Sequence, residues 1–200
     1  MYNRLMWRRA RIRALTVAAT LAVAAAPAPS GPARADGELW SLLKGGGQVV
    51  LMRHALTTPG VGDPPGMRLD DCRTQRNLSE EGRRDARRVG EAFRARGIPV
   101  ARVRSSPWCR CIETARLAFG AAETWDALGN LFGRPERRDE EVGQMRPVVG
   151  ERPAAGNLVL VSHGSTISAL TGVSLSSGEM VVVTPQGGGH FTVAGRLTAH

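Results

Sequence analysis

Three short runs along the chain have the length and the β-branched content of strands. They are residues 48–52 (QVVLM), 100–103 (VARV) and 158–161 (LVLV). Turn-forming or polar residues flank each run, which is typical of short buried strands. We therefore expect these three segments to form the inner part of a sheet.

Helical patterns alternate with these strands. The first helix is expected after Ser79, a favourable N-cap, with glutamates in its first turn and an apolar stripe that ends before Gly97. A second is expected over 109–119, stopping at Gly120, and a third over 164–171. This alternation predicts an α/β fold with three layers, α/β/α, around a mostly parallel central sheet.

The remaining segments are less regular. Residues 179–184 and 190–194, joined by PQGGG, predict a C-terminal hairpin in which the glycines form the turn. Residues 121–157 are rich in charge, proline and glycine, and no element is assigned to them.

The N-terminal segment has the pattern of an export signal. Residues 1–13 carry five arginines and no acid, residues 14–26 are almost all small and apolar, and Ala33-Arg34-Ala35 fits the small-x-small cleavage rule. We expect 1–35 to be a cleaved signal peptide and 36–200 a single domain, the alternative being an uncleaved anchor. The apolar run is short for a bilayer span. The expected location is the periplasm or the exterior, with no stable membrane span after cleavage.

Removing this segment changes the charge. The whole chain has 27 basic and 18 acidic residues, but six arginines lie within 1–35, so the rest carries only +3. A mild positive charge without interleaved aromatic residues does not favour nucleic-acid binding.

In the oxidising compartment that export implies, one pair of cysteines can bond and one thiol is left over. The chain has three cysteines, Cys72, Cys109 and Cys111. The C-x-C spacing disfavours a bond within the close pair, so we expect Cys72 to bond to either Cys109 or Cys111, the alternative being three reduced thiols.

Polar side chains follow each of the three expected strands. The segments read VVLMRH, ARVRSSPWCR and LVLVSHG. Because ligands bind outside the carboxyl ends of parallel strands, we expect Arg53, His54, Ser105, Arg110 and His163 to meet in one crevice. Cationic groups gathered there favour a phosphate, held by guanidinium groups and by N–H groups at the start of the helix near Cys109.

Four segments occur in an order that resembles the histidine phosphatase superfamily, the phosphoglycerate-mutase-like proteins. They are LMRHA, NLSEEGRRDARRVGEAF, SSPWCRCIETA and VLVSHGSTISALTG. Within that superfamily, the short exported form with WCRC, TARLAFG and a late GEMVV resembles a periplasmic branch of lipopolysaccharide core heptose phosphate phosphatases. The resemblance implies a phosphoglycerate-mutase-like fold and a phosphorylated small molecule or envelope glycan as substrate.

The resemblance also implies roles for individual residues. His54 would be the nucleophile that becomes a phosphohistidine, while Arg53, Arg110 and His163 would hold the phosphoryl group. Thr57 and Ser105 are further candidates for substrate binding. Neither a metal nor another cofactor is required.

One part of the superfamily pattern is missing. Relatives often carry an acid, which protonates the leaving oxygen, four residues before an aromatic-Gly pair, and here that position holds Gly129. The candidates to replace this acid are Glu179, Asp126, Glu123 and Glu136. Without a proton donor, phosphoramidates and aryl phosphates should react better than sugar phosphates.

Two other function classes remain open. The first is a phosphate- or phosphoglycan-binding module of the same fold with little or no turnover. The second is a cysteine or zinc protein built on Cys109, Cys111 and a histidine, for which the ligand spacing is wrong.

Overall fold

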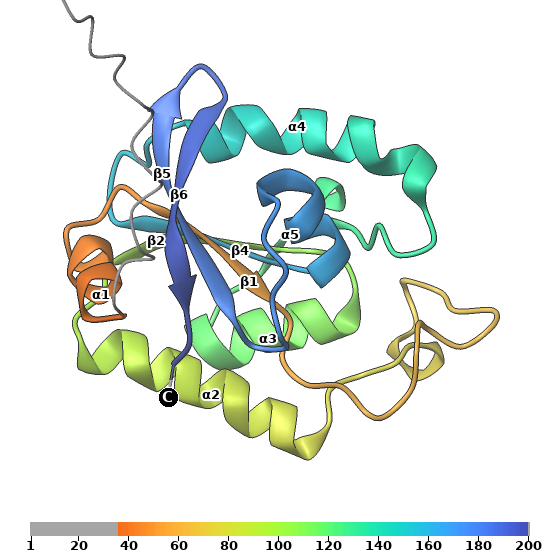
Figure 1. Ribbon diagram of the computed structural model, residues 1–200. Coiled ribbons are helices and arrows are strands. Elements are labelled where there is room, and N and C mark those ends of the chain that lie inside the picture. Colours follow the sequence, from red (N-terminus) through yellow and green to blue (C-terminus); the bar gives the residue numbers. More distant parts are fainter. Residues whose placement is uncertain (1–35, 200) are drawn as a thin grey trace, which may run out of the picture. The chain divides into compact units, whose positions relative to one another are not determined.

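The computed structural model describes residues 36–199, which form a sheet with helices on both faces (Figure 1). The strands are β1 (Val49–Arg53), β2 (Val100–Ser105), β3 (Glu123–Thr124), β4 (Asn157–Ser162), β5 (Met180–Gly187) and β6 (His190–Leu197). Their order across the sheet is β3-β2-β4-β1-β5-β6. The pairs β3·β2, β2·β4 and β4·β1 are parallel, and β1·β5 and β5·β6 are antiparallel.

The signal peptide predicted over residues 1–35 lies outside the described residues. Within residues 36–199, no helix combines the length and the hydrophobicity needed to cross a bilayer.

The helices are α1 (Asp36–Lys44), α2 (Glu80–Ala95), α3 (Cys109–Phe119), α4 (Arg138–Gly150) and α5 (Gly164–Thr171). Alternation along β1 explains the two hydrophobic layers. Val50 and Met52 pack with residues of α1, α2 and α3, whereas Val49 and Leu51 pack with residues of α4 and α5. Figure 1 shows α2 and α3 on one side of the sheet and α4 and α5 on the other. The predicted three-layer α/β fold is therefore confirmed.

The expected strands and helices are confirmed to within a few residues, including Ser79, whose side chain accepts a hydrogen bond from the Gly82 N–H. Two helices were not predicted. α1 buries only Leu39 and Leu43, and α4 lies inside the unassigned segment 121–157. α4 contains a proline, Pro147, and only two of its four buried residues, Met145 and Val149, are large and apolar, so its sequence shows no clear apolar stripe.

A motif glycine fixes how the chain enters α2. A Cβ on Gly82 would overlap the carbonyl oxygen of Leu56, which lies on the loop that follows β1. The glycine in NLSEEG is therefore needed for close packing between this loop and α2, and that loop forms one wall of the site described next.

Candidate active site

The carboxyl ends of the inner parallel strands bring the predicted site residues together. Arg53 is in register with Ser162 on β4, so His54 and His163 both follow directly at the same edge. The centroids of these two imidazole rings lie 5.4 Å apart. The next parallel strand, β2, leads through a short turn into α3 and thereby brings Arg110 to this edge.

A cavity of about 550 Å³ opens at this edge. Four predicted catalytic residues line it, Arg53, His54, Arg110 and His163. The other residues that line it come from the loop after β1, from the loop before α4, from α5 and from the segment after α5: Gly60, Val61, Gly62, Arg76, Asn130, Phe132, Gly164, Ser165, Ser168, Ser174 and Leu175.

Three arginines supply the charge of this cavity, and each is held by its Nη atoms. Nη1 of Arg53 donates to the Leu175 carbonyl at 2.7 Å. Nη1 of Arg76 donates to the Gly60 carbonyl at 2.7 Å, and Arg110 uses both Nη atoms to bind a carboxylate. The Nε atom of each of the three is buried and has no partner within residues 36–199. Since a buried guanidinium donor requires an acceptor, three unpartnered Nε–H groups on arginines that line one cavity favour an oxyanion as its ligand.

The environment of His54 determines its protonation. Its Nδ1 lies 2.8 Å from the Ala55 carbonyl oxygen, and because a carbonyl only accepts, Nδ1 carries the proton. Nε2 is left with its lone pair. Burial lowers the pKa of His54 to about 3, an effect opposed by the Ala55 hydrogen bond and reinforced by the neighbouring arginines. The imidazole is therefore neutral at pH 7, as a nucleophile must be.

His163 is held by two groups on the other side of the site. Its Nε2 lies 2.9 Å from the Ser106 hydroxyl and 3.5 Å from the Cys111 sulfur. Burial, followed by the proximity of His54, lowers the pKa of His163 well below its usual value. Burial raises the pKa of the Cys111 thiol to about 12, so this cysteine is not a nucleophile at neutral pH.

Sequence reasoning missed Arg76 and Ser106. Arg76 lies on the long loop before α2, two residues before the leucine of NLSEEG, in a stretch without strand or helix periodicity. Ser106 is the neighbour of the serine that was predicted. The pattern SSPWCR signals a hydroxyl at this strand end without specifying which of its two serines faces His163.

Two predicted binding residues do not reach the cavity. Thr57 is buried, pairs with Leu78 in an isolated bridge and does not line the cavity. Ser105 is fully buried and donates to the Ser106 carbonyl. At the start of α3, the Cys109 N–H donates to Oε1 of Gln75, so this one of the expected N–H groups is already used within the protein.

The four candidate proton donors lie outside the cavity as well. Glu179 is buried and accepts from Nη2 of Arg196 at 2.6 Å, because the β5·β6 pairing brings these residues together. Glu123 is exposed and binds Arg102 at 2.7 Å. Asp126 and Glu136 are exposed on short 3-10 helices. None of the cavity-lining residues within 36–199 is acidic.

An acid that was not predicted lies against Gly129. A Cβ on Gly129 would sit 3.4 Å from Oε1 of Glu141, a residue of α4 that is 1% exposed. Burial raises the pKa of Glu141, and Arg137, whose Nε lies 3.0 Å away, opposes this effect. The superfamily pattern places an acid at the position of Gly129, and here the carboxyl group of Glu141 lies next to that position. Glu141 does not line the cavity.

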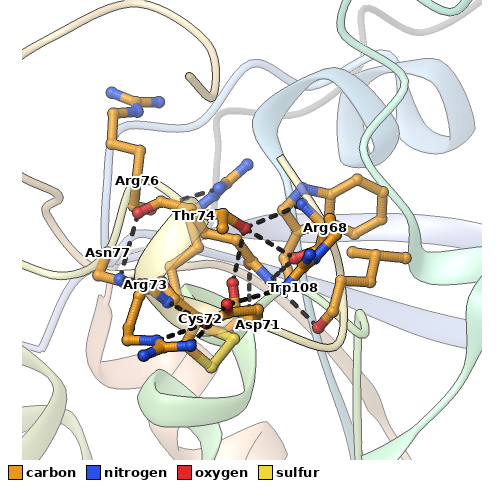
Figure 2. Close-up of a disulfide and its surroundings, with 12 residues drawn as sticks. Arg68, Asp71, Cys72, Arg73, Thr74, Arg76, Asn77 and Trp108 are labelled. Atoms are coloured by element: carbon orange, nitrogen blue, oxygen red, sulfur yellow. Dashed lines mark hydrogen bonds and ion pairs between the residues drawn. A yellow bond between two sulfur atoms is a disulfide. The ribbon is translucent and has the colours of Figure 1, made fainter. Parts of the chain in front are cut away.

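The disulfide joins the long loop to α3. Cys72 is bonded to Cys109, with their Cα atoms 5.7 Å apart, which agrees with one of the two predicted pairings, and Cys111 is free. Figure 2 shows the bond with Asp71 and Arg73 close by and the Arg76 side chain extending away from it. The bond therefore anchors the segment that carries Arg76 next to the residue that precedes Arg110.

Residues 36–199 contain no group of three or more histidine, cysteine or acidic side chains that could hold a metal ion. The family to which the chain belongs follows from a comparison of sequences. The model of the histidine phosphatase superfamily (branch 1) matches residues 49–148. The chain belongs to this superfamily. Membership of this superfamily makes it a phosphoric monoester hydrolase of the histidine phosphatase type.

Solved structures with the same fold include three phosphatases that are named for different substrates. The protein histidine phosphatase SixA complexed with tungstate is 16% identical, with a TM-score of 0.54 over 76% of this chain and 97% of that chain. A mycobacterial glucosyl-3-phosphoglycerate phosphatase is 18% identical, with a TM-score of 0.54 over 73% and 96%. A mutant phosphoserine phosphatase from Entamoeba histolytica complexed with phosphoserine is 12% identical, with a TM-score of 0.55 over 76% and 98%. At these identities the likeness shows the fold alone. A comparison with curated protein sequences finds no match.

Proposed function

We propose that this protein is an exported phosphatase that hydrolyses a phosphomonoester or a phosphoramidate through a phosphohistidine on His54. The observation that carries the proposal is the set of three buried, unpartnered Nε–H groups around a neutral imidazole whose Nε2 lone pair is free. An anion with several oxygens satisfies these donors together, and the imidazole supplies the nucleophile.

The proposed reaction has two steps. Nε2 of His54 attacks phosphorus in line, a P–N bond forms, and the bond from phosphorus to the leaving oxygen or nitrogen breaks. Arg53, Arg76 and Arg110 bind the phosphoryl oxygens, on which negative charge is distributed in the transition state. Water then attacks the phosphohistidine, inorganic phosphate leaves, and the imidazole returns to its neutral form.

The lack of a proton donor among the described residues of the cavity lining limits which substrates this site can hydrolyse. Since no acidic residue from 36–199 lines the cavity, the leaving group takes its proton from water or departs as a stable base. Phosphohistidine and aryl phosphates meet this requirement, and a structural neighbour is described as a protein histidine phosphatase. The lack of an acidic residue from 36–199 in the cavity lining argues against the heptose phosphate of a lipopolysaccharide core as the substrate. A phosphorylated envelope glycan or metabolite with a better leaving group meets the requirement.

Trapping the intermediate tests the mechanism. The protein is incubated with an aryl phosphate, quenched in alkali, and digested to locate acid-labile phosphate. We expect phosphate on His54, no signal and no hydrolysis in His54→Ala, and a normal signal in His190→Ala, a control at an exposed residue on β6. Hydrolysis that persists in His54→Ala rejects the proposed nucleophile.

Export is the second part of the proposal. The arginine-rich, apolar N-terminal segment and the Cys72–Cys109 disulfide support it, because structural disulfides persist in oxidising compartments. The full chain is expressed in a bacterial host, fractionated and sequenced from its N-terminus. A periplasmic product that begins at Asp36 is expected, whereas a full-length cytoplasmic product rejects export.

A phosphate-binding module is the alternative function. It is favoured by the same lack of a carboxyl group in the cavity lining. Phosphate binding by calorimetry, together with hydrolysis of aryl phosphates no faster than in buffer, is the result that would establish it.

A further inference from the structure

The carboxylate that binds Arg110 belongs to Asp63, on the loop between β1 and α2. The side chains of both residues are buried, with 10% of Asp63 and 1% of Arg110 exposed. Arg110 donates from Nη1 to Oδ1 at 2.6 Å and from Nη2 to Oδ2 at 3.1 Å. Oδ1 also accepts from the Arg76 N–H at 3.1 Å, and Oδ2 from Nε1 of Trp108 at 3.1 Å. Each carboxylate oxygen therefore accepts two hydrogen bonds from the protein.

The planar shape of the guanidinium group determines what this pairing leaves free. Asp63 occupies the end of the Arg110 fork, between its two Nη atoms. The Nε–H and one Nη2 hydrogen lie along a different edge of the same plane. Nε is buried without a partner in the described part of the chain, and Arg110 lines the cavity. One edge is thus used for anchoring while the other is left for a ligand oxygen.

The net charge of the groups around the cavity also matches a bound phosphoryl group. Arg53, Arg76 and Arg110 contribute three positive charges, and Asp63 brings the total to +2. Burial alone raises the pKa of Asp63, but the hydrogen bonds and the charge of Arg110 outweigh burial, so the pKa is lowered and the carboxylate stays ionised. A total of +2 beside neutral histidines balances a dianionic phosphoryl group.

We propose that Asp63 is a positioning residue that fixes the Arg110 guanidinium with its Nε edge toward the phosphoryl oxygens. This role rests on the proposed function, because it acts on the same phosphate site. Through its bonds to the Arg76 backbone and to Trp108, Asp63 also holds the long loop against the start of α3. It does not transfer a proton, since it lies outside the cavity lining and both of its oxygens already accept two bonds.

Substitution of Asp63 with and without Arg110 tests this role. We compare the wild type, Asp63→Asn, Arg110→Gln and the double variant, with Asp70→Asn as the control, because Asp70 lies on the same loop and its side chain is 86% exposed. The readouts are kcat/KM for a series of aryl phosphates, the Kd of inorganic phosphate and the thermal midpoint. Trp108→Phe, which removes one donor to the same carboxylate, gives a second and milder variant.

Misplacing one guanidinium should reduce kcat/KM about 10- to 100-fold in Asp63→Asn, by the same factor for every aryl leaving group. The Kd of phosphate should rise about tenfold. Because Asp63 acts through Arg110, the substitution should change kcat/KM less than about threefold in the Arg110→Gln background. Trp108→Phe should shift Kd in the same direction by a smaller factor, and Asp70→Asn should match the wild type.

Other results overturn the proposal. A loss that grows with the leaving-group pKa identifies a proton donor, and a gain in kcat/KM identifies a carboxylate that competes with substrate. A lower thermal midpoint with unchanged kcat/KM and Kd identifies a purely structural contact. Equal losses in both Arg110 backgrounds show that Asp63 acts through another residue, such as Arg76, and not through Arg110. If the wild type does not hydrolyse aryl phosphates, the proposed function fails separately. In that case the Kd of inorganic phosphate by itself tests the role of Asp63. A Kd that is unchanged in Asp63→Asn rejects that role.

Discussion

The imidazole rings of His54 and His163 lie 5.4 Å apart and meet edge to face at 69°, although the two residues are 109 positions apart in the sequence. Their proximity results from the direct parallel pairing of β1 with β4 at the centre of the sheet. Both rings are almost completely buried, and both line the same cavity. The proposed nucleophile and the proposed partner for the phosphoryl group are therefore positioned by two paired strands at the centre of the sheet.

The two adjacent serines at the end of β2 should differ in their effect on catalysis. Ser106→Ala removes the hydroxyl that lies 2.9 Å from Nε2 of His163 and should lower kcat/KM about tenfold, close to 1.4 kcal/mol. Ser105→Ala removes a hydroxyl that donates only to the Ser106 carbonyl and should change kcat/KM less than about threefold. Steady-state kinetics with an aryl phosphate compares them, and a larger loss in Ser105→Ala contradicts the assignment.

The parts of the site that sequence predicted are those attached to regular strands. Arg53, His54 and His163 directly follow apolar runs, so the topology of a parallel sheet brings them to one edge. Arg110 follows from the helix that succeeds β2. The positions of these residues could therefore be predicted from the strand pattern in the sequence together with the topology of a parallel sheet.

The residues that sequence missed depend on contacts without periodicity. Arg76 and Asp63 belong to a long loop whose course is determined by the Cys72–Cys109 bond and by the ion pair with Arg110. Glu179 was a reasonable acid to consider until the pairing of β5 with β6 placed it beside Arg196. Side-chain partners of this kind follow from tertiary packing and leave little signal in a single sequence.

Two helical glycines should respond oppositely to alanine. A Cβ on Gly90 in α2 would overlap the carbonyl oxygen of Ala118 in α3, so Gly90→Ala should destabilise the fold by about 1–3 kcal/mol. Gly143 lies inside α4 with nothing within 4 Å of an added Cβ, so Gly143→Ala should stabilise it by about 0.5–1 kcal/mol. Urea denaturation measures both, and a stabilised Gly90→Ala contradicts the close contact between α2 and α3.

Loss of the disulfide should affect both stability and phosphate binding. Cys72 and Cys109 are separated by 37 positions, so removing their bond should lower the free energy of unfolding by about 3–4 kcal/mol. The Kd of phosphate should rise, because the bond anchors the loop that carries Arg76. Denaturation and calorimetry on the Cys72→Ser/Cys109→Ser variant, without and with reductant, test this. A reductant should destabilise the wild type and leave the variant unchanged, whereas a wild type that is insensitive to full reduction contradicts the prediction.

The buried histidines should make stability depend on pH. Burial lowers the pKa of both His54 and His163, whereas in the unfolded chain histidine titrates near about 6.5. Below that pH the unfolded state binds more protons than the folded state, so the free energy of unfolding falls as pH decreases from about 6.5 toward 3. Each histidine contributes a slope that approaches about 1.4 kcal/mol per pH unit. Denaturation between pH 7 and 4 should therefore show a flatter dependence in His54→Gln than in the wild type, and parallel curves contradict the buried neutral state.

The composition of the cavity lining predicts a steep dependence of rate on the leaving group. General acid catalysis contributes about 10²- to 10⁴-fold, and no acid from residues 36–199 lines this cavity, so alkyl phosphates should react at least about 100-fold more slowly than aryl phosphates. Glu141 is the decisive control, because it is buried beside Gly129 and its pKa is raised by that burial. Glu141→Gln should leave the ratio of aryl to alkyl rates unchanged. A selective loss of alkyl phosphate hydrolysis in that variant would show that Glu141 reaches the leaving oxygen, and sugar phosphates would then become acceptable substrates.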